Sequence, residues 1–276
     1  MIQWFGMEVY DIVLLALGGI FSGVLAGFLG IGGGVVLVPM LVAFGYIPVQ
    51  AVATSSLAIL VTSTAGSIQN WRMGFLSWRR VILLGLPAVI TAQVGAFLAG
   101  KFLPYILLAA FGVLLLINIY LVELRKRLLS SGVNSSKLMT PLMARLVTGG
   151  LAGFLAGLFG VGGGVIMVPL QILLLGEPIK TAIQTSLGVI VITAISACIG
   201  HAAAGNILVA PGLILGVGGL VGVQFSTRFL PKLPDQFVSL LFRSMLALLS
   251  LYIFFQAWQS YQGAGALVSE YPTSIL

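Results

Sequence analysis

Charged residues are scarce in this chain. Only 7% of its 276 residues are Asp, Glu, Lys or Arg, and 59% are hydrophobic. Soluble domains carry about 25% charged residues. A water-facing surface cannot be built from so few charges, so we expect most of the chain to lie in lipid. The net charge of +7 could suggest nucleic acid, but the basic residues stand in short loops between apolar runs, which is typical of membrane topology.

Cysteine, histidine and deeply placed acids are also nearly lacking. One cysteine, Cys198, excludes an internal disulfide and a cysteine-rich metal site. Glu123, Glu177 and Asp235 flank apolar runs and do not interrupt them. Many cation pumps and proton-coupled carriers use buried carboxylates. Their absence favours an anion or a neutral solute, disfavours a hydrolase with paired carboxylates, and leads us to expect a protein that is not an enzyme and has no cofactor.

An internal duplication covers nearly the whole chain. Gly30–Pro39 reads GIGGGVVLVP, and Gly160–Pro169, 130 positions later, reads GVGGGVIMVP. Between residues 19–39 and 149–169, 12 of 21 positions are identical. With one inserted residue, Asn70 matches His201 and Gln93 matches Gln224. Self-similarity at this scale indicates two structurally equivalent halves.

Each half contains five apolar segments, and a helix needs about 20 apolar residues to span a bilayer. The predicted segments are 11–29, 35–44, 49–68, 81–99, 104–122, 146–159, 165–175, 181–200, 207–227 and 237–258. We therefore predict an all-α integral membrane protein with ten segments. The predicted regions are a first transmembrane repeat at 1–123, a cytoplasmic linker at 124–145, a second repeat at 146–258 and an extramembrane tail at 259–276.

An odd number of segments per half turns the second half upside down in the membrane. With both termini outside, 11 of the 13 basic residues fall in inner loops, the exceptions being Lys101 and Arg243. Positive charge in short loops marks the cytoplasmic side. The prediction is two inverted repeats in a bacterial inner membrane with both termini periplasmic. It also holds if each opening pair is a re-entrant hairpin.

The glycine-rich motifs are predicted breaks in a helix. Four glycines in five residues disfavour a continuous helix, since each costs about 1 kcal/mol against alanine. Inverted-repeat transporters place such breaks at their binding site, where half-helix amino termini attract anions. The alternative is a tight turn that binds nothing. A nucleotide-binding loop would need a lysine after the glycines and a strand before them, and neither is found here. The glycines spaced four apart at 19, 23 and 27, and at 149, 153 and 157, indicate close helix packing.

Polar residues inside the segments complete the candidate site. Two triplets lie at equivalent positions near the start of their helices, and two amides are matched in mid-span. The predicted solute-binding residues are Gly32, Gly33, Gly34, Thr54, Ser55, Ser56, Gln93, Gly162, Gly163, Gly164, Gln184, Thr185, Ser186 and Gln224. The hydroxyls could instead bond the preceding helical turn, and the amides could join helices. His201 is a candidate proton-linked group or a structural one.

The doubled Gly-x-Gly-Gly-Gly-x-x-x-x-Pro, each copy followed by Ser55-Ser56-Leu57 or Thr185-Ser186-Leu187, resembles the sulfite exporter TauE/SafE family. The stretch from His201 to Gly205 also resembles it. The resemblance spans roughly residues 10 to 258 and implies movement of sulfite or organosulfonates across the inner membrane.

Three alternatives stay open at this point. They are a carrier or channel for another anion or a neutral solute, an intramembrane enzyme using Cys198 and His201, and a structural membrane partner. Expected partners are lipid and a small anion, with homo-oligomer formation undecided and nucleic acid excluded.

Overall fold

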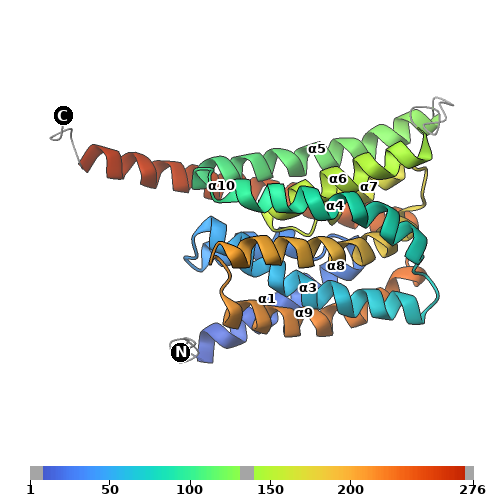
Figure 1. Ribbon diagram of the computed structural model, residues 1–276, viewed down its shortest axis with the longest axis horizontal. Helices are drawn as coiled ribbons and strands as arrows, with labels where there is room; N and C mark the ends of the chain where they lie inside the picture. The colour runs from blue at the N-terminus through green and yellow to red at the C-terminus, as the bar shows by residue number, and fades with distance from the viewer. Residues whose placement is uncertain (1–8, 131–139, 271–276) are drawn as a thin grey trace.

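The protein is all-helical in the residues that its computed structural model describes, 9–130 and 140–270 (Figure 1). Its helices are α1 (Val9–Leu29), α2 (Gly34–Ala43), α3 (Pro48–Arg72), α4 (Trp78–Ala99), α5 (Pro104–Ser130), α6 (Pro141–Phe159), α7 (Gly164–Leu174), α8 (Ile179–Ala203), α9 (Val209–Phe229), the short 3-10 turn η2 (Leu230–Lys232) and α10 (Asp235–Glu270). Eight of the described helices are long and apolar enough to cross a membrane, and α2 and α7 are shorter apolar helices. The prediction of ten apolar segments in an integral membrane protein is confirmed.

Helix ends follow local chemistry more than bilayer thickness. Pro48, Pro104 and Pro141 each stand at a helix start, where the missing proline N–H costs nothing. Helices α5 and α10 run on to Ser130 and Glu270, into stretches predicted as linker and tail. The predicted linker therefore contains helix on both sides of residues 131–139. Those nine residues and 271–276 lie outside the described part of the chain.

The two halves are interleaved. Helix α1 packs along α9 of the other half, and α6 packs along α4. The glycines of α1 make this closeness possible: a Cβ on Gly23 would collide with the carbonyl of Gly219. In α6, a Cβ on Gly153 would do the same with the carbonyl of Ala88. The glycines predicted to serve helix packing do so, and their partners come from the opposite half.

Helices α3 and α8 cross at the centre, between these two pairs (Figure 1). They are the most deeply buried of the long helices described: 72% of the most apolar 18-residue stretch of each is buried. The pairs α1–α9 and α4–α6 flank them, and α5 packs against α10. Matching contacts in the two halves indicate a pseudo-twofold axis that relates α3 to α8.

The start of α1 and the end of α10 lie at the same end of the bundle (Figure 1). The opposite end holds the turn between α3 and α4, the end of α5 and the start of α6. It also carries ion pairs of Arg80 with Glu177 and of Lys180 with Asp235, each at 3.3 Å. We call this the basic end. The arrangement fits two inverted halves, and the first ion pair joins them.

Candidate functional site

Each glycine motif forms a sharp turn between a long helix and a short one. Gly30, Gly32 and Gly33 have φ of 67°, 72° and 85°, and their counterparts Gly160, Gly162 and Gly163 have 64°, 73° and 77°. Side-chain-bearing residues rarely adopt this left-handed region, so glycine is required here. Helix α2 then begins at Gly34 and α7 at Gly164. The predicted breaks are present at both motifs.

The two glycine turns meet each other at the centre of the molecule. A Cβ on Gly34 would lie 2.5 Å from the carbonyl oxygen of Gly160, and one on Gly164 would collide with the carbonyl of Gly30. Side chains of Ile59 and Ile190 cover both turns, and each is fully buried. The structure therefore brings all six predicted glycines together.

One serine joins each turn to the other half. Ser55 Oγ lies 2.7 Å from the carbonyl oxygen of Gly160, and Ser186 Oγ lies 2.7 Å from that of Gly30. Each hydroxyl also lies within 3.0 Å of a carbonyl one turn back in its own helix, which competes for the same proton. These serines were predicted to contact solute. In this conformation they join the halves, a role that sequence spacing alone could not reveal.

Some amide groups of the two turns keep their donor capacity. Leu37 N–H donates to the carbonyl of Gly33, and Met167 N–H to that of Gly163, at the start of each short helix. The main-chain bonds outside helices in the described residues include none from the N–H groups of Gly32, Gly34 or Gly164. Free donors in the first turn are expected at any helix start. They lie close to the pseudo-twofold axis, but all six glycines are buried.

The remaining residues of the two polar triplets, 54–56 and 184–186, have different surroundings. Thr54 Oγ1 accepts from Leu208 N–H at 3.1 Å, and Ser56 Oγ bonds Val52 O in its own helix. Gln184 and Thr185 are buried in α8, close to the turn that Ser186 holds. The expectation that hydroxyls bond the preceding helical turn therefore describes Ser56 fully and Ser55 and Ser186 in part, since these two also bond the opposite turn.

The matched amides have different surroundings. Gln93 Nε2 donates to Ser196, so it joins α4 to α8 across the halves. Gln224 lines a cavity of about 500 Å³ between α3 and α9, together with Arg72 and Thr64. Neither amide lies at the glycine turns. The structure thus separates the two glutamines from the rest of the predicted site.

His201 is fully buried, and its Nε2 lies 3.0 Å from the carbonyl oxygen of Gly157. This contact ties α8 to α6. Cys198, one turn earlier in α8, is only half-buried and lines a different space. A thiol–imidazole pair would require a hydrogen bond between Cys198 and His201, and the described hydrogen bonds of His201 include none to this cysteine.

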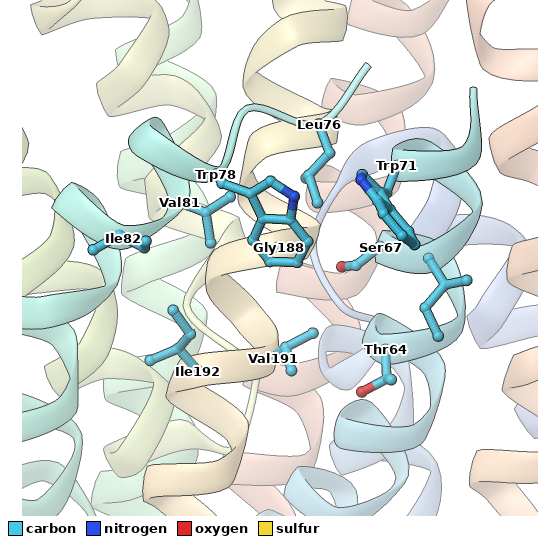
Figure 2. Close-up of a pocket in the computed structure, with 11 residues that line it drawn as sticks. Thr64, Ser67, Trp71, Leu76, Trp78, Val81, Ile82, Gly188, Val191 and Ile192 are labelled. Carbon is cyan, nitrogen blue, oxygen red and sulfur yellow. The ribbon is translucent and has the colours of Figure 1, made fainter. Parts of the chain in front are cut away.

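Two further cavities flank the centre. One, of about 310 Å³, lies between α3, α4 and α8 at the basic end (Figure 2). The other, of about 510 Å³, lies between α3, α8 and α9 at the opposite end. Sequence reasoning did not find them, although the pairing of Ser67 with Cys198 in the repeat alignment was an available signal.

Comparison with known proteins relates this sequence to membrane transporters. The sequence profile described as Sulfite exporter TauE/SafE matches residues 15–253. A probable membrane transporter protein of Methanocaldococcus jannaschii is 25% identical over 87% of this chain and 94% of its own length. The probable membrane transporter protein YunE of Bacillus subtilis is 23% identical over 88% and 97%. One from Xylella fastidiosa is 26% identical over 90% and 97%. No solved structure gives a significant match.

Proposed function

Because the chain belongs to the sulfite exporter TauE/SafE family of membrane transporters, we propose that it moves a small sulfur-containing oxyanion out of the cell across the inner membrane. The observation that carries the proposal is the meeting of two glycine turns at the pseudo-twofold axis, where the first amides of α2 and α7 remain available. Helix amino termini favour anions through these amides and through the helix dipole.

Transport by this site requires the halves to move. The glycine turns are sealed here by Ile59 and Ile190, so this conformation is a closed one. We propose that the bonds of Ser55 and Ser186 to the opposite glycine turns break or shift when the halves rock, exposing the amides to one face and then to the other. This is alternating access as inverted-repeat carriers use it. The predicted serines would then take part in gating as well as in solute contact.

The direction of transport follows from the charge of the solute. A potential of 100 mV, negative inside, is worth about 2.3 kcal/mol per elementary charge. A monovalent anion is driven outward by that amount without a coupling ion. The basic end, with its short positively charged loops, is proposed to face the cytoplasm, and both termini the periplasm.

The test is anion flux into proteoliposomes containing the purified chain. Sulfite, thiosulfate and methanesulfonate would be compared under an imposed potential of either sign. We expect flux of at least one sulfur oxyanion, accelerated when the compartment receiving it is positive. Flux of a neutral solute alone, or of no solute, would reject the proposal.

A further inference from the structure

The two cavities beside the α3–α8 crossing are copies of each other. Seven of the eight residues that line the cavity at the opposite end stand 131 positions from a residue that lines the cavity at the basic end. The pairs are Leu57 with Gly188, Ser67 with Cys198, Ile68 with Ile199, Trp71 with Ala202, Leu76 with Ile207, Trp78 with Val209 and Ile82 with Leu213. We call the cavity at the basic end the inner chamber and its copy the outer chamber.

The central seal is formed by Ile59 of α3 and Ile190 of α8. Along α3, Ile59 stands between Leu57 of the outer chamber and Thr64 of the inner one. Along α8, Ile190 stands among Gly188, Val191 and Ile192 of the inner chamber, before Cys198 of the outer one. These two isoleucines also cover the glycine turns. The same two helices therefore line both chambers and carry the isoleucines that close the glycine turns.

The inner chamber contains a polar group without a partner. Ser67 is only 8% exposed, and its Oγ has no hydrogen-bond partner among the described residues. Its neighbour Thr64 bonds the carbonyl of Leu60 one turn back, as hydroxyls in helices usually do. Figure 2 shows the Ser67 hydroxyl directed toward α8, into the chamber. A buried, unbonded hydroxyl is costly, which points to a ligand that supplies the missing bond.

Most of the chamber lining is hydrocarbon. Trp71 and Trp78 meet edge to face at 6.4 Å near its mouth, and Val81, Ile82 and Ile192 line it further (Figure 2). A bare sulfite ion would lose its water there without enough donors in return. An alkyl group would gain from burial in a space of this size. The lining therefore fits a ligand with an apolar body and one charged end.

From these observations we propose that the two chambers bind the hydrocarbon body of a small organic anion, such as an alkanesulfonate, at either end of its route. The proposal rests on the proposed transport function and deepens it, because it selects organic sulfonates over bare sulfite. The bulky Trp71 and Trp78, where the outer chamber has Ala202 and Val209, make the inner chamber the narrower one, and there the Ser67 hydroxyl donates to the anion.

The single cysteine allows the test to use the natural protein. Cys198 lies in the outer chamber, and its counterpart in the inner chamber is Ser67. The second protein carries Ser67→Cys and Cys198→Ser, so that each half receives the residue its copy already has. The probe is 2-sulfonatoethyl methanethiosulfonate, a membrane-impermeant thiol reagent, applied to intact spheroplasts and to inverted vesicles. A control with Cys198→Ser and Leu103→Cys places the thiol in the exposed turn between α4 and α5, outside both chambers.

We expect the two chamber thiols to react from opposite faces. Butanesulfonate should slow both reactions at least fivefold and leave the Leu103→Cys control unchanged. The butanesulfonate concentration that halves the labelling rate should exceed the corresponding hexanesulfonate concentration by up to about fourfold per methylene. This is the factor expected from burial of one methylene group. Sulfite and 1-butanol should protect much less, because one lacks the apolar body and the other lacks the charge.

The possible failures can be distinguished. If sulfur oxyanions are transported but alkanesulfonates protect neither thiol, the transport proposal stands and the chamber proposal fails. If protection occurs without flux, the chambers bind organic anions but the transport proposal fails. Equal protection by 1-butanol and butanesulfonate would show lipid-filled crevices and overturn the assignment, as would labelling of both thiols from the same face.

Discussion

At the residue scale, the most informative side chains are the two serines that cross between the halves. Removing the hydroxyl of Ser186 leaves the carbonyl of Gly30 buried without that donor, and a loss of this kind costs about 1–3 kcal/mol. We expect Ser186→Ala to lower the unfolding stability by this amount in detergent and to alter the transport rate. Ser56→Ala is the matched control, because Ser56 bonds only its own helix, and it should cost less. Equal losses would mean that the cross-half bond contributes nothing of its own.

His201 gives a second prediction at this scale. Its ring is enclosed and bonds the carbonyl of Gly157, whereas the first half has Asn70 at the matching position. The shorter side chain of His201→Asn should lose that bond and about 1 kcal/mol or more of stability. Transport by the folded variant should keep the pH profile of the natural protein. A pH profile that disappears in His201→Asn would instead assign the proton-linked role considered from the sequence.

At the element scale, neighbouring glycines of α6 make opposite predictions. A Cβ on Gly149 would collide with the carbonyl of Leu84, whereas one on Gly150 would meet nothing closer than 3.9 Å. Gly149→Ala should therefore force α6 away from α4 and destabilise the protein by about 1–3 kcal/mol, as overpacking does. Gly150→Ala should be neutral or stabilising, since alanine favours the helix by up to about 1 kcal/mol. Thermal unfolding of both variants in detergent measures the difference, and equal effects would contradict the packing described here.

The sequence was most informative about the positions of the helices. Hydropathy placed all ten apolar segments, because each must be apolar to lie in lipid. It missed the last turns of α5 and α10, since a helix can continue into water once its apolar part has left the bilayer. It located both glycine turns because left-handed backbone strongly favours one residue type. It could not tell which helices become neighbours, so the contact of Ser55 with Gly160 and the structural use of Gln93 had no local signal.

At the scale of the whole molecule, the topology predicts where loops are accessible. Phe75 lies in the turn at the basic end and Leu103 in a turn at the opposite end, and both are exposed. In a Cys198→Ser background, Phe75→Cys should react with an impermeant maleimide in inverted vesicles, and Leu103→Cys in intact spheroplasts. The reverse pattern would show that the chain is inserted with its termini inside. Reaction of both from one face would contradict a membrane-spanning α4.

The pairing of α1 with α9 has a consequence for biosynthesis. About 180 residues separate the end of α1 from the start of α9, so at 5–20 residues per second a ribosome needs roughly 10 to 35 s to deliver the partner. During that interval the glycine-lined face of α1 has no helix to receive it. The newborn first half must wait in the bilayer, shielded by lipid or by the insertion machinery, until nearly all of the second half has been translated.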